Sequence, residues 1–347
     1  MKLVSVVTAC YNEEENVEET YRRVKEIFAA LPAYRYEHIF IDNSSTDRTV
    51  EILRRLARED RNLKVIVNSR NFGHTRSPVH GMLQARGDAV IAIVADLQEP
   101  LEILPVFLEK WEAGARIVMG VRTGQKENPV MSAVRQAYYD LIGRLSEVEL
   151  TRNFYGFGLY DRSVLDFVRQ MDDPYPYWRG LISEIGLQPV KVEYVQNPRK
   201  RGSTKGNLYT LYNLAMHGIT SHSKVPLRLA TMFGFAASAL SFLAGMTYLV
   251  YKLLYWDRFQ VGVAPLVIGI FFFSSVQMFF IGILGEYVGS IHTQVVRRPL
   301  VFEKERINFD DRDEESAPPD RGDPAGGERE DGVAVALEML AVAQAAG

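Results

Sequence analysis

The stretch LVSVVTACYNE at residues 3–13 decides the fold, because a run of mostly apolar residues ends abruptly in polar ones. Leu3–Ala9 is short and rich in β-branched residues, which is typical of a strand buried on both faces. Apolar residues then recur at helical spacing from Val17 to Leu31. A buried strand followed by an amphipathic helix is the repeating unit of a parallel sheet covered by helices.

The same alternation continues over the first two hundred residues. His38–Ile41 ends a second strand at Asp42, and a helix with apolar residues at Val50, Leu53 and Leu56 follows it. We predict further strands at 63–67, 89–95, 117–121 and 190–195, helices at 77–85, 101–111, 130–145 and 164–170, and an irregular segment at 153–161. The predicted class is α/β, with a Rossmann-like, mostly parallel sheet whose ligands bind beyond the carboxyl ends of its strands.

Composition bounds the kind of protein. The 347 residues are 47% hydrophobic and 24% charged, which is globular, and a single cysteine excludes a disulfide framework. The formal net charge of −3 is unevenly spread, because residues 310–347 hold 11 acidic and 3 basic residues. This tail is too polar to bury a core, so we expect it to be disordered.

Two uncharged stretches, 229–251 and 261–285, are each long enough to span a bilayer. Buried helices of a soluble protein are the alternative, but two such stretches nine residues apart favour a transmembrane hairpin. The outer ends of the hairpin carry more basic residues than the connection between its two helices. No secretory signal is expected at the N-terminus. We therefore expect a multi-pass protein of the cytoplasmic (inner) membrane, with both termini in the cytoplasm.

Polar residues follow each of the first four predicted strands. They are Tyr11 and Glu13, Asp42, Arg70, and Asp96 with Gln98. A single aspartate after a strand is usually a turn residue or a helix cap. Together, however, these residues meet at one edge of a parallel sheet, and their oxygens suit Mg²⁺ or Mn²⁺ bridging to a nucleotide diphosphate.

The sequence lacks the motifs of other phosphate-binding and metal-binding sites. No Walker sequence is present, and the glycines at 156 and 158 lack the third glycine and the position of a dinucleotide motif. His74 and His80 do not share a helix face closely enough to indicate a zinc site. We expect no nucleic-acid partner.

Several motifs in order resemble those of the polyprenyl-phosphate glycosyltransferases of family 2, which have the GT-A fold. The motifs are Tyr11-Asn12-Glu13, Asp42-Asn43-Ser44-Ser45, Ser69-Arg70-Asn71-Phe72-Gly73-His74, Gly120-Val121-Arg122, Arg179-Gly180-Leu181, Val225-Pro226-Leu227-Arg228, Gly285-Glu286-Tyr287 and Arg298-Pro299. The resemblance covers about residues 1–306. Within the family, the chain is similar to dolichyl-phosphate mannose synthases and bacterial O-antigen glucosyl-modification enzymes. It implies transfer of one sugar from a nucleotide diphosphate, with UDP favoured, to polyprenyl (undecaprenyl) phosphate, with inversion.

The resemblance also implies roles for individual residues. Tyr11, Glu13, Asp42 and Arg70 would bind the nucleotide sugar, and Asp96 with Gln98 would hold the metal and the diphosphate. Arg122, Arg135 and Lys205 would receive the acceptor phosphate, and Asp96, Arg122 and Arg135 would be catalytic. It further implies a homo-oligomer formed through the hairpin.

Two departures from the family pattern bear on chemistry. Val94 stands where the family has the first aspartate of Asp-Ala-Asp, so metal binding would depend on Asp96, Gln98, Glu99 and the diphosphate. Gly156 replaces a candidate base. A phosphate acceptor, with a second pKa of about 6, is already largely ionised near pH 7 and needs no base.

Rival functions remain at this point. One is a polysaccharide synthase of the same fold, which the absence of Gln-x-x-Arg-Trp disfavours, and another is a non-catalytic nucleotide-sugar-binding scaffold. The expected organisation is a catalytic domain at 1–200, an interfacial basic segment at 201–226, the hairpin at 227–289, a juxtamembrane segment at 290–309 and the tail at 310–347.

Overall fold

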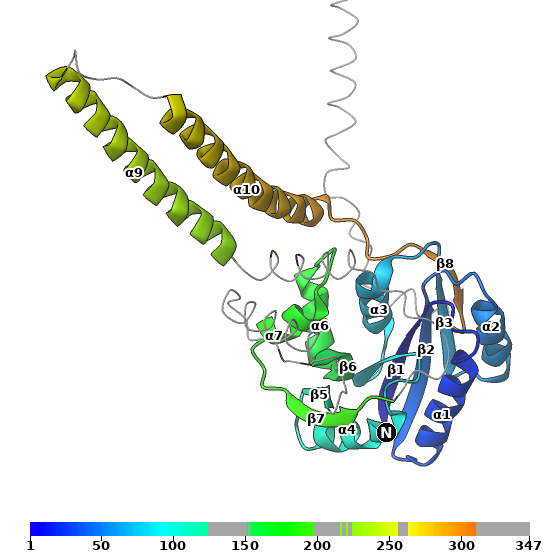
Figure 1. Cartoon of the computed structure of the whole chain (residues 1–347). Helices are drawn as coiled ribbons and strands as arrows, with labels where there is room; N and C mark the ends of the chain where they lie inside the picture. The colour runs from blue at the N-terminus through cyan, green and yellow to red at the C-terminus, as the bar shows by residue number, and fades with distance from the viewer. Residues whose placement is uncertain are drawn as a thin grey trace, which may run out of the picture. The chain divides into compact units, whose positions relative to one another are not determined.

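An eight-stranded mixed sheet organises the chain, with strand order β7-β5-β6-β4-β1-β2-β3-β8 (Figure 1). The computed structural model describes residues 1–123, 153–197, 224–255 and 263–309, together with 151, 216 and 220. The strands are β1 (Lys2–Cys10), β2 (Tyr34–Asp42), β3 (Leu63–Asn68), β4 (Ala89–Val94), β5 (Ile117–Thr123), β6 (Phe154–Asp161), β7 (Val190–Val195) and β8 (Glu303–Ile307). Strands β1 to β4 are parallel to one another, as predicted.

Helices cover both faces of this sheet. They are α1 (Val17–Ala29), α2 (Thr49–Glu59), α3 (Gly73–Gln84), α4 (Leu104–Glu112), α6 (Arg162–Met171) and α7 (Trp178–Glu184), with a short 3₁₀ turn η1 (Leu101–Ile103). One apolar core joins α1 and α4 to β1 and β4, with Phe28 and Phe107 among its buried side chains. Helix α3 packs against β1, β2 and β4, and α6 contacts both α3 and β6.

The segment expected to be irregular is strand β6, so that prediction was wrong. It runs antiparallel between β4 and β5 and pairs Leu159 with Ile91. A Cβ on Gly158 would lie 2.4 Å from the carbonyl oxygen of Val118, so only glycine allows this close approach. The two glycines lower the strand propensity of the segment, which is why the sequence pattern did not reveal it.

Strand β8 was also not predicted, because charged residues occupy most of it. It follows the apolar helices and pairs antiparallel with β3, so a distant part of the chain extends the sheet. The Arg54 guanidinium holds this strand, since its Nε lies 3.1 Å from Oε1 of Glu305. His80 on α3 bonds to Glu303.

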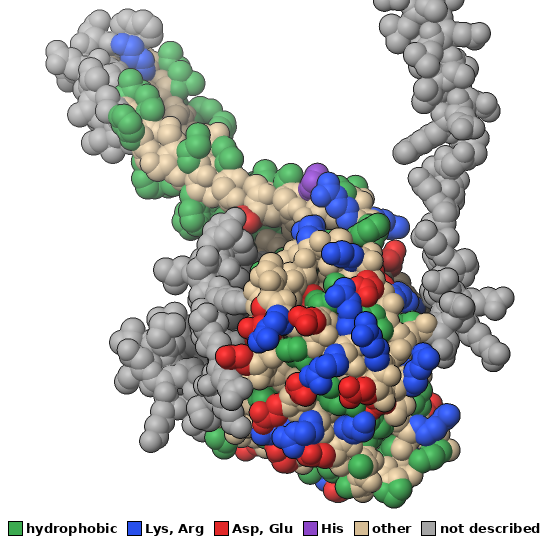
Figure 2. Space-filling view, turned by 90° about the vertical axis from the view of Figure 1, so that its right-hand side faces the viewer, with side chains coloured by type: hydrophobic (Ala, Val, Ile, Leu, Met, Phe, Trp, Pro, Cys, Tyr) green, Lys and Arg blue, Asp and Glu red, His purple; other side chains and the backbone are tan. Residues whose placement is uncertain are grey.

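Two long apolar helices, α9 (Val225–Leu254) and α10 (Val263–Val296), confirm the two helices expected from the uncharged stretches. Val225–Leu254 and Gly269–Val296 are long and apolar enough to cross a membrane, and neither is buried in the chain. Figure 2 shows hydrophobic side chains along the helical segment, whereas the globular part has a mixed charged surface. The helix predicted at 130–145, the segment 201–215 and the tail 310–347 lie outside the described residues.

A buried histidine in the centre of the sheet couples folding to pH. His38 is 1% exposed, its Nε2 lies 2.7 Å from Oγ1 of Thr8, and its Nδ1 has no hydrogen-bond partner. Burial lowers the pKa of His38 to about 3. The imidazole is therefore neutral in the folded protein at pH values where an unfolded histidine, with a pKa of about 6.5, takes up a proton.

We predict that, because of His38, the free energy of unfolding falls by about 2 kcal/mol from pH 7 to pH 5. Stability is full above the unfolded pKa and falls as the pH drops, because only the unfolded chain binds the proton. His38→Gln should remove this part of the pH dependence. Chemical unfolding of the detergent-solubilised protein at both pH values measures it, and an equal loss of stability in wild type and variant would refute the prediction.

Candidate functional site

The carboxyl ends of β1, β2, β3 and β4 meet at one edge of the sheet. The parallel register aligns Cys10 with Asp42, and Asp42 with Val67, so the loops after these strands begin side by side. Strand β6 runs the other way, which brings its first residues to the same edge. The polar residues predicted from the strand ends therefore converge, as the sequence indicated.

Asn43 connects three of these loops. Its Nδ2 donates to Oδ1 of Asn71 at 2.9 Å and to the carbonyl of Gly73 at 3.0 Å. Its Oδ1 accepts the Phe72 N–H at 2.8 Å, and its backbone N–H donates to the Cys10 carbonyl at 3.0 Å. With only 8% of the residue exposed, this amide fixes the loops after β1, β2 and β3 relative to one another.

Asn12 and Glu13 make a second connection between the loops after β1 and β2. Oδ1 of Asn12 accepts the Thr46 N–H at 2.7 Å, and the Glu13 N–H donates to Oγ1 of Thr49 at 2.9 Å. Oε2 of Glu13 accepts from Asn16 at 2.6 Å. Tyr11 and Glu13 are both partly buried, so they form part of the wall of this edge rather than free surface.

Asp42 lies at the floor of the edge and is completely buried. Its carboxylate accepts the Ser45 N–H at 2.9 Å and also the Ser45 hydroxyl. Burial raises the pKa of Asp42, while the hydrogen bonds from Ser45 oppose that rise. The Asp42 carboxylate thus stabilises the loop at 42–45 through these hydrogen bonds.

The turn after β4 presents Asp96 and Gln98 and buries the residue between them. Leu97 has a φ of +56° and is 4% exposed, since its side chain belongs to the apolar core. Oδ1 of Asp96 accepts the Gln98 N–H at 3.2 Å, and the Gln98 carbonyl accepts the Asn197 N–H at 2.9 Å. A left-handed leucine is strained, and such strain is concentrated at functional sites.

Glu99, the residue after Gln98, is buried, with 9% of its surface exposed. Its Oε2 accepts the Val94 N–H at 3.2 Å, and burial raises its pKa to about 8. The described residues contain no group of three histidine, cysteine, aspartate or glutamate side chains able to hold a metal. The expectation that Glu99 contributes to a metal site therefore stays a prediction.

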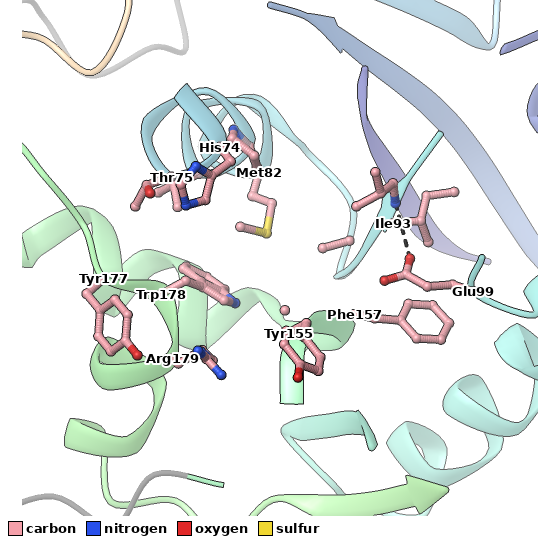
Figure 3. A pocket seen from close by; sticks show the side chains of 15 residues that line it. His74, Thr75, Met82, Ile93, Glu99, Tyr155, Phe157, Tyr177, Trp178 and Arg179 are labelled. Carbon is pink, nitrogen blue, oxygen red and sulfur yellow. Dashed lines mark hydrogen bonds between the residues drawn. The ribbon is translucent and has the colours of Figure 1, made fainter. Parts of the chain in front are cut away.

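Glu99 instead lines a cavity of about 200 Å³ beside the turn (Figure 3). His74 and Thr75 come from the start of α3 and Trp178 from α7, while Tyr155 and Phe157 come from β6. Aromatic rings form much of the wall, and the carboxyl group of Glu99 is one of its few polar groups (Figure 3). Gly156 also lines the cavity, with a φ of +103°.

Two arginines lie near the ring of Tyr155, which forms part of the cavity wall. The guanidinium carbon of Arg122 lies 5.9 Å from the ring centroid, and that of Arg179 lies 5.4 Å from it. Arg179 also donates to the Phe154 carbonyl at 3.0 Å. Nε of Arg122 is buried without a hydrogen-bond partner. The structure thus offers two positive charges beside an apolar pocket.

The other predicted cationic residues are placed differently. Arg70 is exposed, and its guanidinium lies 4.1 Å from the centroid of the Phe72 ring. Arg135 and Lys205 lie outside the described residues. Sequence reasoning assigned no role to Arg179, Tyr155 or Trp178, although the Arg179 motif had been noticed. The signal that could have indicated a role for Arg179 is the aromatic-rich segment 175–178 that precedes it.

Comparison with known sequences identifies the family. Residues 5–168 match glycosyl transferase family 2. The uncharacterized glycosyltransferase YkcC of Bacillus subtilis (strain 168) is 35% identical over 309 residues, which are 89% of this chain and 95% of that protein. The chain belongs to glycosyl transferase family 2. The bactoprenol glucosyl transferase of Shigella phage SfII is also 35% identical, over 85% of this chain and 96% of its own length.

Solved structures with partial likeness include two transferases. Glucosyl-3-phosphoglycerate synthase of Mycobacterium tuberculosis, in complex with UDP, has a TM-score of 0.40 and 22% identity, covering 63% of this chain and 78% of that one. Mannosyltransferase PcManGT of Pyrobaculum calidifontis, in complex with GDP-Man and Mn²⁺, has a TM-score of 0.40 and 16% identity, covering 74% and 88%. The GT-A class expected for this family 2 chain is confirmed by its mixed, mostly parallel sheet with helices on both faces.

We predict that Asn43→Ala lowers the free energy of unfolding by about 2 kcal/mol, because it leaves buried amide and carbonyl groups unpaired. It should also weaken binding of UDP, the donor group proposed below, since the loops after three strands lose their common anchor. Thermal unfolding and calorimetric titration with UDP measure the two effects. Asn71→Ala, an exposed residue that shares only one of the side-chain bonds of Asn43, is the control and should change both less; equal effects would contradict the prediction.

Proposed function

We propose that this family 2 glycosyltransferase moves a single sugar, with inversion, from a nucleotide diphosphate to polyprenyl phosphate at the cytoplasmic face of the membrane. The observation that supports it most is the likeness to bactoprenol glucosyl transferases over 96% of their length. Bactoprenol is a polyprenyl lipid, and α9 and α10 give this chain two helices suited to reach such an acceptor. The excess of basic residues at their outer ends favours the cytoplasmic orientation.

The donor, for which we favour a UDP-sugar, would lie across the loops after β1 to β4. Tyr11, Glu13 and Arg70 would surround the nucleoside, while the buried Asp42 would act on it through the loop at 42–45, at an edge already fixed by Asn43 and Asn12. Ligands of doubly wound sheets bind at this edge, beyond the carboxyl ends of the strands. The diphosphate would extend toward Asp96 and Gln98.

Family 2 enzymes of the GT-A class commonly use a divalent metal, and the residues after β4 fit one in a limited way. Asp96 and Gln98 offer one carboxylate and one amide oxygen, while Val94 contributes no ligand and Glu99 is buried. Mg²⁺ is often held by one carboxylate together with substrate phosphates. Mg²⁺ or Mn²⁺ would therefore be bound with the diphosphate, where it would neutralise the charge of the leaving group.

The cavity beside the turn would receive the transferred sugar. Its aromatic walls, Tyr155 and Trp178, suit the apolar face of a sugar ring, and Glu99 offers a hydrogen-bonding group for a hydroxyl. A site that pairs a buried polar group with a hydroxyl discriminates strongly against sugars lacking it.

The acceptor phosphate would bind beside Arg122 and Arg179, with Arg135 and Lys205 as further candidates. Nε of Arg122 is buried and has no hydrogen-bond partner among the described residues, so the guanidinium would gain a partner by binding an oxyanion. Guanidinium groups bind phosphate oxygens through paired, charge-assisted hydrogen bonds. Since the phosphate is already ionised, these residues need only position it against the sugar carbon.

We predict that Asp96→Ala lowers sugar transfer at least about 100-fold, because the diphosphate and its metal lose their carboxylate. The assay measures radiolabelled sugar moved from UDP-, GDP- and dTDP-sugars to undecaprenyl phosphate in detergent, with Mg²⁺, Mn²⁺ or chelator. Glu102→Ala, a nearby glutamate whose side chain is 67% exposed, is the control and should retain activity. Donor binding without transfer from any donor would favour the non-catalytic scaffold instead.

Arg122→Gln should raise KM for undecaprenyl phosphate about 10- to 100-fold and leave KM for the nucleotide sugar nearly unchanged, since one charge-assisted contact is lost. Arg116→Gln, an exposed arginine just before the same strand, should change neither constant. Initial rates with each substrate varied separately give the two values. A rise confined to the nucleotide-sugar KM would place Arg122 at the donor instead.

A further inference from the structure

Three arginines from separate parts of the chain meet near the start of α3. Arg70 follows β3, Arg76 lies on α3, and Arg298 comes two residues after α10. The guanidinium carbons of Arg70 and Arg76 lie 4.1 and 5.3 Å from the centroid of the same Phe72 ring. Arg76 also donates to the carbonyl of Pro299, which brings the residue next to Arg298 against α3.

Within the part of the chain that the structure describes, no acidic side chain pairs with this arginine cluster. None of its three members forms an ion pair with a carboxylate in the described ranges 1–123, 153–197, 224–255 and 263–309. Nε of Arg76 is buried and has no hydrogen-bond partner. Burial, together with the charges of Arg70 and Arg298, lowers the pKa of Arg76. Uncompensated like charges of this kind favour a bound anion.

The neighbouring contacts show that the imbalance is local. Further along the same C-terminal segment, Glu303 bonds to both His80 and Arg306, so the second half of α3 has its acidic partner. The nearby carboxylate of Asp173 accepts from Gln294 at 3.0 Å and from the Tyr175 N–H at 2.9 Å. Among the described residues, the start of α3 next to Arg298 has no such acidic partner.

The position in the chain indicates which anion is available. Arg298 lies two residues beyond Gly269–Val296, the second helix able to cross a membrane. Basic residues at such a point lie at the level of the lipid headgroups, where they are attracted to anionic lipid. Guanidinium groups match phosphate oxygens in geometry as well as charge.

We infer that Arg76 and Arg298 form a binding site for the phosphoryl group of an anionic phospholipid, in addition to the acceptor position beside Arg122, while Arg70, proposed above for the donor, adds positive charge to the same cluster. A lipid bound there would join the loop after β3, helix α3 and the segment after α10 through one headgroup. Because α3 supplies His74 and Thr75 to the cavity, this lipid would also fix one wall of the cavity at the membrane surface. The site does not depend on the chain being a transferase.

Native mass spectrometry of the full-length protein in detergent tests the site. Phosphatidylglycerol or phosphatidylcholine is titrated into wild type, Arg298→Gln, Arg76→Gln and the control Arg297→Gln. We expect wild type to retain phosphatidylglycerol in preference to phosphatidylcholine, and both cluster variants to lose about tenfold in affinity. Arg297→Gln removes the same charge from the adjacent exposed residue and should stay within about twofold of wild type. Arg298 is exposed, so its variant reports on the site even if Arg76→Gln fails to fold.

Two further arms separate the other sources of phosphate. Unfolding temperatures are measured with inorganic phosphate, and UDP affinity is measured by calorimetry, for wild type and Arg298→Gln. Unchanged UDP affinity supports a lipid site. Loss of UDP binding in Arg298→Gln would assign the cluster to the donor diphosphate, and stabilisation by inorganic phosphate without selective retention of phosphatidylglycerol would assign it to free phosphate; either result overturns the inference. Equal retention by wild type and Arg298→Gln, or an equal loss in Arg297→Gln, overturns it as well.

Discussion

The hydrogen bonds of Asn43 are the constraint on which the candidate site depends. A parallel sheet brings the carboxyl ends of its strands to one edge, but the loops that follow are irregular and have no ladder to hold them. One buried amide joins the loops after β1, β2 and β3 through bonds of 2.8 to 3.0 Å. Left-handed residues at Asn12, Ser44 and Leu97 show that the backbone of this edge is bent away from its preferred conformations. The core and the amide network together compensate for that strain.

The part of the fold that could be predicted from sequence is the part built by local pattern. Strands β1 to β4 are buried, mostly apolar runs, and the helices between them have a clear apolar face. Each of these strands and helices can therefore be predicted from a stretch of about 20 residues. Strand β6 does not, since Gly158 is dictated by the carbonyl of Val118, a residue about 40 positions earlier in the chain. Strand β8 has an alternating, half-buried pattern of charged residues, and its pairing with β3 is set by side chains such as Arg54 that lie far away in sequence. Tertiary contacts override propensity in both cases.

The candidate site divides in the same way. The residues that follow strands, such as Asp42 and Asp96, could be placed because strand direction determines where they lie. The burial of Glu99 could not be predicted, because it depends on the left-handed turn at Leu97 and on the core that buries that side chain. The position of Arg179 could not be predicted either, since it lies on a short helix whose place is set by packing of Trp178 against Tyr160, 2.9 Å apart between the indole nitrogen and the hydroxyl.

The proposed phosphate acceptor would explain why this edge needs no base at the position of Gly156. An alcohol acceptor would have to lose a proton as it attacks, and a base would have to stand beside it. Gly156 places no side chain there, and a Cβ at that position would meet only Trp178, at 3.7 Å. A phosphate monoester, with a second pKa of about 6, is already largely ionised near pH 7. The protein then has to bind its negative charge and need not remove a proton. In the proposed function arginines would meet that demand, because Arg122 near the end of β5 and Arg179 on α7 both lie near the ring of Tyr155. The same reasoning relates Val94 to the donor, because a diphosphate supplies the oxygens that a missing carboxylate would otherwise contribute to a metal.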